Sequence, residues 1–411
     1  MSNAASGAEG GAAAERGETG ADYHTRVHEH PRGIVRDRWN TLLAAQAEPT
    51  VFMRHEVLAA LHESQSAVPR TGWAPRFITL EERARAGEPP HLRAAAALYL
   101  KTHSYGEYVF DWSWAEAYRR HGLRYYPKLL GAVPFTPVPG TRLLAASPTW
   151  RDRLVGAVQG WAAQQQLSSA HMLFTDEADT QALARAGWLV RHGVQFHWQA
   201  LPGAAAGFDE FLASLQRDKR KKIQQERRRV AEQGIDFTVH HGREIDQPLW
   251  DFFHHCYTLT YRAHGSAPYL TRAFFAAMAA TMPEHWLLFV ARRSGAAIGC
   301  SLIALDPARR VAYGRYWGAT EQVPCLHFEA CYYQPLAWCM AQGYRRFEGG
   351  AQGEHKMARG LLPVRTASAH WLADARFADA VANFLGAEGT HVDNYVDELR
   401  ERSPFRREPG G

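Results

Sequence analysis

The stretch FEGGAQGEHKMARGLLP, residues 347–363, decides the fold prediction for this chain. It continues from YRRF, residues 344–347, which reads as the start of a short strand, and it contains Gly349, Gly350 and Gly353. Glycine tolerates positive φ and lets the backbone approach a ligand closely. Successive amides in such a loop can form a cradle for an anion or a carbonyl oxygen. The stretch therefore predicts a sharp strand-to-helix turn at a ligand site.

Side chains of different chemistry surround these glycines. The set includes carboxylates, an amide, an imidazole and two cations: Glu348, Gln352, Glu354, His355, Lys356 and Arg359. Acyl transfer to an amine needs a proton acceptor and a group that stabilises an oxyanion. His355 or Glu354 can accept the proton, and Lys356, Arg359 or the loop amides can stabilise the charge. On a helix, His355 and Arg359 would share a face. The alternative is a structural turn followed by a solvated helical turn.

Composition places the chain among ordinary globular proteins. Its 411 residues suit two or three domains, and 46% hydrophobic with 22% charged residues supply material for cores. No apolar run approaches the roughly 18 residues of a membrane span. Residues 1–30 lack a signal-peptide pattern, and we expect disorder there and a flexible tail over 401–411.

The cysteines indicate free thiols in a reducing cytoplasm. They are odd in number, lie in the second half and form no Cys-x-x-Cys motif: Cys256, Cys300, Cys325, Cys331 and Cys339. The histidines do not form a closed set at metal-ligand spacing, so the sequence predicts neither a metal site nor a tightly bound cofactor.

Two segments share the order strand, loop, helix, strand, at about 125–175 and 311–350. Small residues at 201–207 read as a linker. We therefore predict two similar mixed α/β domains, 31–200 and 208–400, each with its own sheet. Strands at 125–137 and 311–318 should occupy corresponding places in the two domains.

Other local patterns predict individual elements. Residues 286–293 and 296–305 read as a hairpin turning at Ser294 and Gly295. Asp111 is a plausible N-cap for a helix that runs to about Arg120. A helix is also expected from about 326 to 342.

Residues 208–233 read as one long helix with a basic face. Eight cations and two carboxylates give residues 217–229 a net charge of +6, against +5 for the whole chain. The cations are Arg217, Lys219, Arg220, Lys221, Lys222, Arg227, Arg228 and Arg229. This concentration favours a polyanionic partner such as tRNA, a nucleotide-linked precursor or a membrane surface. A solvated helix face is the alternative.

A second polar group lies in the first half of the chain. It consists of Lys101, His103, Glu107, Lys128 and Arg142. In an extended segment, Lys101 and His103 share a face and can line an acceptor cleft between the domains. A buried salt-bridge network is the equal alternative.

Several long strings give the chain a family resemblance. They are FMRHEVLAALHES (52–64), LYLKTHSYGEYVFDWSWAEAY (98–118), YYPKLLGAVPFTPVPGTRLL (125–144), RHGVQFHW (191–198), RDKRKKIQQERRRV (217–230), YGRYWG (313–318), HFEACYYQPLAW (327–338) and the stretch at 347–363. From about Phe52 to Glu388 the chain resembles the FemAB-like family, often labelled peptidoglycan biosynthesis/recognition, within the GNAT acyltransferase superfamily.

The resemblance implies tandem GNAT-like domains and an acyl- or aminoacyltransferase. Fem proteins proper transfer an amino acid from aminoacyl-tRNA to a peptidoglycan-precursor amine. The matching strings add Arg315, Tyr316, Trp317 and Glu329 as substrate-binding candidates. Donor and acceptor stay open: aminoacyl-tRNA or acyl-CoA, and a small-molecule amine. Fold analogy does not carry reaction specificity.

An ordinary acetyl-CoA enzyme is disfavoured. RRSGAA, residues 292–297, has the letters of the superfamily's pyrophosphate loop, but it lies at the expected hairpin turn and precedes no helix. Two alternatives to an acyl- or aminoacyltransferase stay open. One is a non-catalytic recognition protein on a degenerate GNAT fold, and the other is an acetyl-CoA-dependent N-acetyltransferase.

Overall fold

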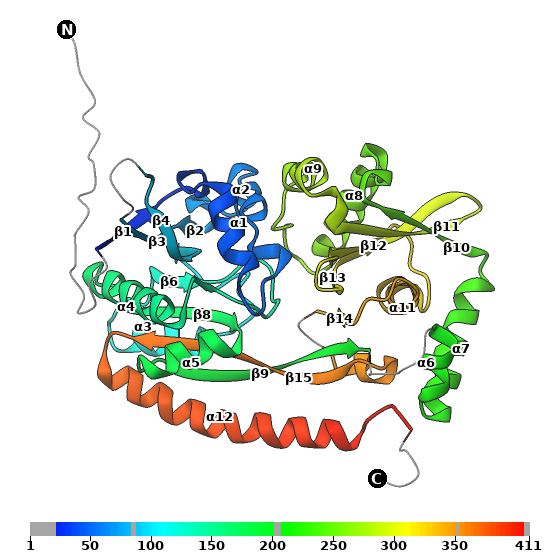
Figure 1. Ribbon diagram of the computed structural model, residues 1–411. Coiled ribbons are helices and arrows are strands. Elements are labelled where there is room, and N and C mark those ends of the chain that lie inside the picture. Colours follow the sequence, from blue (N-terminus) through cyan, green and yellow to red (C-terminus); the bar gives the residue numbers. More distant parts are fainter. Residues whose placement is uncertain (1–21, 84–87, 201–206, 351–352, 407–411) are drawn as a thin grey trace.

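One mixed sheet runs through both halves of the protein (Figure 1). The computed structural model describes residues 22–83, 88–200, 207–350 and 353–406. Within these residues the sheet has eleven strands in the order β10-β11-β12-β13-β14-β9-β15-β8-β6-β5-β2, and a separate four-stranded sheet has the order β1-β3-β4-β7.

The strands range from three to eleven residues in both halves. Their bounds are β1 Tyr23–His28, β2 Trp73–Pro75, β3 Phe77–Glu82, β4 His91–Ala96, β5 Leu98–Lys101, β6 Lys128–Gly131, β7 Leu143–Ala145, β8 Ser169–Thr175, β9 Leu189–Gln199, β10 Ile235–His241, β11 Trp286–Arg293, β12 Ala296–Asp306, β13 Val311–Ala319, β14 Arg346–Glu348 and β15 Leu362–Leu372.

The helices cover both faces of the large sheet. Their bounds are α1 Arg36–Ala44, α2 His55–Glu63, α3 Trp112–Arg120, α4 Pro148–Gln164, α5 Glu177–Arg185, α6 Phe208–Ser214, α7 Arg217–Ala231, α8 Gln247–Ala263, α9 Arg272–Thr281, α10 Leu326–Phe328, α11 Gln334–Ala341 and α12 Ala375–Glu401. A π-helical segment, Glu329–Tyr333, joins α10 to α11, and a 3-10 helix spans Glu354–Arg359.

The two halves repeat one unit. In the first half, β6 leads through α4 to the parallel strand β8, and in the second half β13 leads through α11 to the parallel strand β14. Each parallel ladder contains three residue pairs, 129–131 with 170–172 and 311–313 with 346–348. The predicted strands 125–137 and 311–318 thus occupy corresponding places, although the first is regular only over β6.

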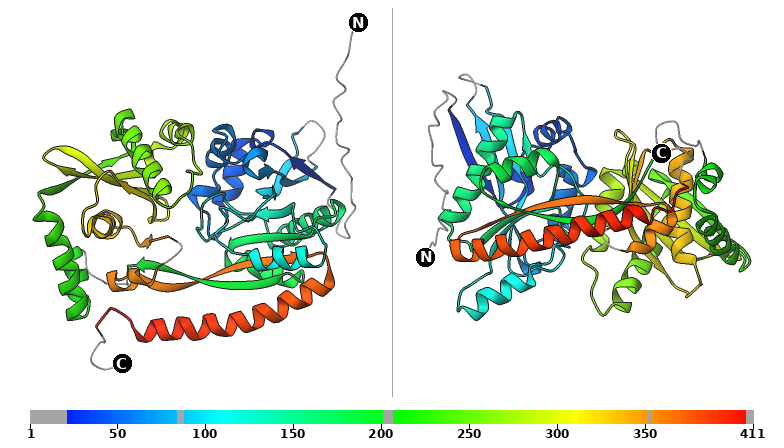
Figure 2. Two further views of the ribbon diagram at one scale, coloured as in Figure 1. Left: turned by 180° about the vertical axis from the view of Figure 1, so that it is seen from behind. Right: turned by 90° about the horizontal axis from the view of Figure 1, so that it is seen from below.

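The expectation of separate sheets is wrong, because the halves exchange their last strands. β9, from the first half, pairs with β14, and β15, from the second half, pairs with β8. β9 and β15 are eleven residues long and pair antiparallel with each other at the centre (Figure 2). α12 runs along their outer face. Since each half completes its sheet with a strand of the other, the fold is a tandem repeat with one continuous sheet.

Several other predictions need correction. The expected helix 208–233 is two helices, because Leu215 leaves the helix to form a β-bridge with Phe405. That bridge also orders part of the expected C-terminal tail, and β1 lies within the expected N-terminal tail. Asp111 precedes α3 without capping it, since its carboxylate accepts hydrogen bonds from Lys128 and Tyr125. The hairpin of β11 and β12 is confirmed. The predicted linker at 201–207 lies, apart from Gly207, outside the described residues.

Candidate functional site

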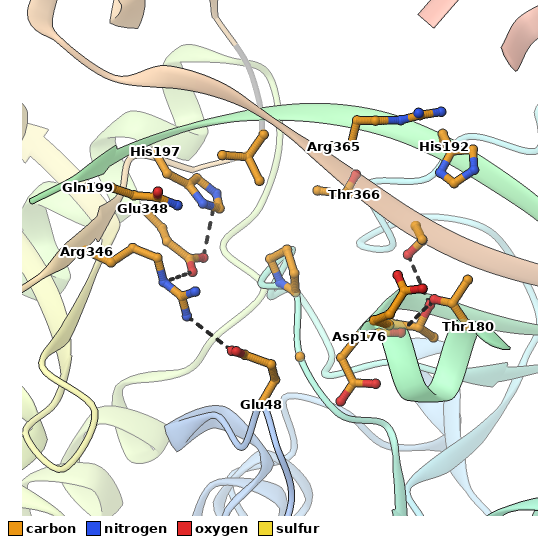
Figure 3. Close-up of a pocket in the computed structure, with 16 residues that line it drawn as sticks. Glu48, Asp176, Thr180, His192, His197, Gln199, Arg346, Glu348, Arg365 and Thr366 are labelled. Carbon is orange, nitrogen blue, oxygen red and sulfur yellow. Dashed lines mark hydrogen bonds and ion pairs between the residues drawn. The ribbon is translucent and has the colours of Figure 1, made fainter. Parts of the chain in front are cut away.

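A cavity of about 380 Å³ lies between the two halves, beneath β9 and β15 (Figure 3). Polar side chains from five elements and one loop line it, among them Glu48, Asp176, Thr180, His192, His197, Gln199, Arg346, Glu348, Arg365 and Thr366. In Figure 3, Glu348 lies between His197 and Arg346 at one end, and Asp176 and Thr180 lie at the other. The strand exchange creates this cavity, because β14 of one half and β9 of the other supply one end together.

Glu348 is the most strongly perturbed carboxyl group in this cavity. It is 4% exposed, its Oε1 lies 3.2 Å from Arg346 Nε, and its Oε2 lies 3.9 Å from His197 Nε2. Oε2 accepts no hydrogen bond from the described residues. Burial raises the pKa of Glu348 to about 7, although Arg346 and Arg315 oppose the shift. A carboxyl group with this pKa can both accept and return a proton near neutrality.

Strand alternation explains why Glu348 faces the cavity. In β14, Phe347 packs into the core formed with α11, so its neighbours Arg346 and Glu348 point to the opposite face. His197 lies across from Glu348 in the ladder between β9 and β14. Burial lowers the pKa of His197 to about 3, so this imidazole is neutral at pH 7.

The end of β14 is also where the parallel pair separates. The ladder between β13 and β14 ends at Tyr313, and a β-bulge follows at once in β13, where Arg315 is the extra residue opposite β12. Bulges of this kind re-aim side chains and often lie beside active sites. Arg315 crosses to the first half, where its Nη2 donates to the carbonyl oxygen of Phe135 at 2.9 Å.

The glycine loop brings Lys356 to the same strand end. Gly350 and Gly353 have φ of +87° and +110°, and a Cβ on Gly349 would lie 2.6 Å from Leu361. Lys356 is buried, and its Nζ donates to the carbonyl oxygen of Gly350 at 2.8 Å. Burial lowers the pKa of Lys356 to about 8. Lys356 and Glu348 thus lie on opposite faces of one strand end.

The other residues of the stretch have partners of their own. His355 is exposed, and its Nε2 lies 3.3 Å from the hydroxyl oxygen of Tyr332. Glu354 is also exposed and accepts a hydrogen bond from Tyr395 at 2.6 Å. Gln352 lies outside the described residues.

Arg359 does not share a face with His355 as predicted. The segment is a 3-10 helix, and the Arg359 guanidinium packs over Phe328 and pairs with Glu226 of α7 at 3.0 Å. It also donates to the carbonyl oxygen of His355 at 2.6 Å. Arg359 therefore joins this segment to α7 and does not face the cavity.

The polar group of the first half forms a buried network. Lys128 Nζ donates to Glu107 at 2.8 Å, to Ser104 at 2.8 Å and to Asp111. Lys101 lies 3.9 Å from Glu107 and 3.7 Å from the centre of the Trp73 ring. The sequence left an acceptor cleft and a buried salt-bridge network as alternatives for these residues, and the structure shows the salt-bridge network.

His103 and Arg142 are also held within the first half. His103 Nε2 lies 3.2 Å from the carbonyl oxygen of Thr71. The buried Arg142 donates to the carbonyl oxygens of Leu173 at 3.0 Å and Gly140 at 3.2 Å. Neither side chain lines the cavity described above.

The remaining candidates of the second half take part in packing. Tyr316 contacts Tyr257, with ring centroids 5.1 Å apart, and Trp317 contacts His327 at 5.3 Å. Glu329, in the π-helical segment, pairs with Arg227 of α7 at 3.2 Å.

The cations of α7 lie exposed or half-buried. Arg217, Lys221, Lys222, Arg228 and Arg229 are exposed, and Lys219, Arg220 and Arg227 are half-buried. Their binding role stays a prediction.

Sequence reasoning missed His197, Arg346 and Glu48. Arg346 pairs with Glu348 and also lies 3.6 Å from Glu48, which comes from a loop of the first half. The alternation in RHGVQFHW and RFE was visible in the sequence. Which strands pair, and therefore which side chains meet, was not.

Two further searches of the described residues gave negative results. They contain no group of three or more His, Cys, Asp or Glu side chains placed to hold a metal ion. They also contain no helix that is long and apolar enough to cross a bilayer.

Comparison with known proteins gives a family and a fold. The model of the FemAB-like family, described as peptidoglycan biosynthesis/recognition, matches residues 31–407. No curated protein matches the sequence.

Solved structures of similar fold match this chain at low sequence identity. The C-terminal domain of a putative lysylphosphatidylglycerol synthetase from Agrobacterium fabrum is 10% identical, with a TM-score of 0.50 over 85% of this chain and 95% of that chain. L-PGS from Bacillus licheniformis is 10% identical, with a TM-score of 0.50 over 84% of this chain and 94% of that one. A tandem GNAT protein from the clavulanic acid biosynthesis pathway, 10% identical, gives a TM-score of 0.46 over 86% and 99%.

Proposed function

The chain belongs to the FemAB-like family, and from this premise we propose that it is an acyl- or aminoacyltransferase that forms an amide on an amine acceptor. The observation that carries the proposal is the environment of Glu348. Its carboxyl group is buried, has a pKa of about 7 and has one oxygen that accepts no hydrogen bond from the part of the chain that the structure describes, at the strand end where β13 and β14 separate. Perturbed groups in a cavity are candidates for catalysis.

In the proposed reaction, Glu348 deprotonates the acceptor. An ammonium group in the cavity loses one proton to the Glu348 carboxylate and becomes a nucleophilic amine. The amine attacks the carbonyl carbon of the acyl donor, a C–N bond forms, and a tetrahedral oxyanion results. When the oxyanion collapses, the bond to the leaving group breaks, and the second proton lost by the attacking nitrogen passes to the leaving group. Glu348 then releases its proton to solvent, so the products are an amide, the protonated leaving group and one proton, and atoms and charge balance.

Lys356 is proposed to act on the donor side. Its ammonium lies at the glycine loop, on the face of β14 opposite Glu348, and can stabilise the oxyanion or protonate the leaving group. Its pKa of about 8 suits such a proton donor. His355, beside Tyr332, is the second candidate on this face, and Glu354 is proposed to hold the turn through Tyr395.

The identity of the substrates forms the finer part of the proposal. The family description, peptidoglycan biosynthesis/recognition, supports a peptidoglycan-precursor amine as acceptor. We propose aminoacyl-tRNA or acyl-CoA as the donor and the cytoplasm as the compartment. The exposed cations of α7 support a polyanionic donor such as tRNA. A non-catalytic recognition protein is the competing function, since the cavity alone also suits binding.

Product analysis tests the proposal. The protein is incubated with aminoacyl-tRNA or acyl-CoA and a nucleotide-linked peptidoglycan precursor, and amide products are identified by mass spectrometry. A transferase gives a new amide that is lost in Glu348→Gln and kept in Glu354→Gln. Saturable precursor binding with no amide from either donor, in the wild type, would instead support the recognition protein.

A further inference from the structure

Exposed aromatic side chains gather on the loop before α3 and at the start of that helix. Tyr105, Phe110 and Trp112 expose 59%, 54% and 41% of their surface, and Leu123, just after α3, exposes 40%. Among the described residues, Phe384 is the only other Phe, Tyr or Trp exposed to this extent. The rings of Tyr105 and Trp112 touch edge to face, with centroids 5.0 Å apart. We name Tyr105, Phe110, Trp112 and Leu123 the aromatic patch.

The loop that carries the aromatic patch is anchored from inside. Glu107 and Asp111 turn inward to the ammonium of Lys128, and Asp111 also accepts a hydrogen bond from Tyr125 at 2.6 Å. These carboxylates alternate along the loop with the outward rings. Removing either acid would leave a buried cation without full compensation, so the anchor is rigid.

The backbone of this loop is fixed as well. Gly106 has φ of +80°, and a Cβ there would lie 2.6 Å from the ring of Phe135. Tyr108, a non-glycine residue, has φ of +65°. Such a conformation persists where its surroundings hold it in place. The outward rings therefore cannot turn in to join the core, and an exposed aromatic group held in this way marks an interaction site.

The charges beside the aromatic patch are mainly positive. Arg119 and Arg120 are more than 70% exposed at the end of α3, and Arg124 is exposed just beyond it. Glu116 pairs with Arg119 at 2.6 Å and with Arg120 at 3.1 Å. Three arginines and one glutamate leave a net charge of +2 on this surface, which complements an anionic partner.

The shape of the surface favours a membrane over a protein partner. Figure 2 shows α3 standing out from the edge of the large sheet in the view from below. Protein interfaces place aromatic anchors in a packed centre with a polar rim. Here the exposed rings lie on the loop before α3 and at the start of that helix, and Arg119 and Arg120 lie in its last turn. That arrangement suits a bilayer surface, with rings at headgroup depth and guanidinium groups on lipid phosphates.

We propose that the aromatic patch docks the protein on an anionic membrane surface. The proposal does not depend on the reaction proposed above. The proposal also concerns how ligands reach a second cavity of about 330 Å³, because Phe110 lines that cavity with Arg191, His192 and Glu388. Docking through the aromatic patch places the opening of that cavity at the lipid surface.

Vesicle co-sedimentation of the full-length protein tests the proposal. The wild type should bind vesicles of phosphatidylglycerol and phosphatidylcholine more tightly than vesicles of phosphatidylcholine alone. In Phe110→Ser/Trp112→Ser, the affinity for the anionic vesicles should fall by a factor of about ten or more, because two apolar rings no longer enter the lipid. An unchanged melting temperature checks that this variant folds.

The matched control lies at the opposite end of the molecule. Lys221→Glu/Lys222→Glu changes exposed cations of α7 and should keep most of the vesicle binding. The proposal is overturned if the wild type does not bind anionic vesicles, or if the aromatic variant binds as tightly as the wild type. It is also overturned if the α7 variant alone loses binding, since α7 would then be the membrane surface.

Discussion

The parallel pairs β6–β8 and β13–β14 share one frame but end in different chemistry. In the first half, the guanidinium of Arg142 fills the end of the pair, donating to the carbonyl oxygens of Leu173 and Gly140. In the second half, the end of β14 carries the ammonium of Lys356, which donates to the carbonyl oxygen of Gly350, and, on the opposite face, the buried carboxyl group of Glu348.

The difference lies in the ability to exchange protons. Burial lowers the pKa of Arg142 to about 10, so this group stays charged at neutral pH and acts as a structural cation. Lys356 and Glu348 have pKa values of about 8 and about 7, so both can change protonation in the neutral range. Under the proposed function, one strand end of the repeated fold serves stability and the other serves chemistry.

The largest expected effect is on turnover in Glu348→Gln. Removing a general base should lower kcat by a factor of about one hundred or more, measured as the rate of amide formation. Glu354→Gln, in the same stretch but exposed and bonded to Tyr395, should stay within a few-fold of the wild type. Equal rates for Glu348→Gln and the wild type would remove the catalytic distinction between the halves.

In the first half, Arg142→Ala should act on stability. It removes a buried donor and leaves several carbonyl oxygens without partners, which should cost about 3 kcal/mol or more. Denaturant unfolding measures this loss. The exposed Arg376→Ala serves as control and should change the free energy of unfolding by about 0.5 kcal/mol or less. If Arg142→Ala leaves the free energy of unfolding unchanged, Arg142 does not stabilise this strand end.

Lys356→Met tests the strand end of the second half. Methionine keeps the length and apolar stem of lysine, so we expect a smaller loss of stability than in Arg142→Ala. Turnover should fall by a factor of about ten, because the charge that stabilises the oxyanion is gone. Unfolding and rate measurements on the same preparations separate the two effects. If Lys356→Met loses stability but keeps full activity, Lys356 is a structural cation like Arg142.

The smallest expected effect concerns α7. Lys221→Glu/Lys222→Glu should weaken tRNA binding several-fold and reduce its salt dependence, because about two phosphate contacts are lost. Filter binding over a range of salt concentrations measures both. Absence of tRNA binding by the wild type at low salt would make α7 a solvated face.

The sequence supported the local elements and the repeated unit, because periodicity, turns and charge runs are local properties. For the same reason it could place Glu348 and Lys356 among the candidate residues, and the structure places both at the end of β14. It could not show that β9 pairs with β14, that Arg359 pairs with Glu226, or that Glu107 and Lys128 are buried together. These contacts join residues far apart in the chain. The role of Glu348 depends on burial, which only the assembled cavity defines.

The central claim is that Glu348 is a carboxyl group held close to neutrality, and its titration tests this most directly. Carboxyl carbon NMR of labelled wild type, compared with Glu348→Gln, isolates the signal of this residue. A pKa raised in the folded state means that the proton stabilises the fold, so wild-type stability should fall as pH rises from about 4.5 to about 7. Glu348→Gln should lack the part of that fall that Glu348 contributes, while Glu107 and Asp179, whose pKa values burial also raises to about 7, keep theirs. The variant should therefore melt higher than the wild type at pH 8. We predict a midpoint near 7 for Glu348, and a midpoint near the ordinary glutamate value of about 4.3 would contradict the account.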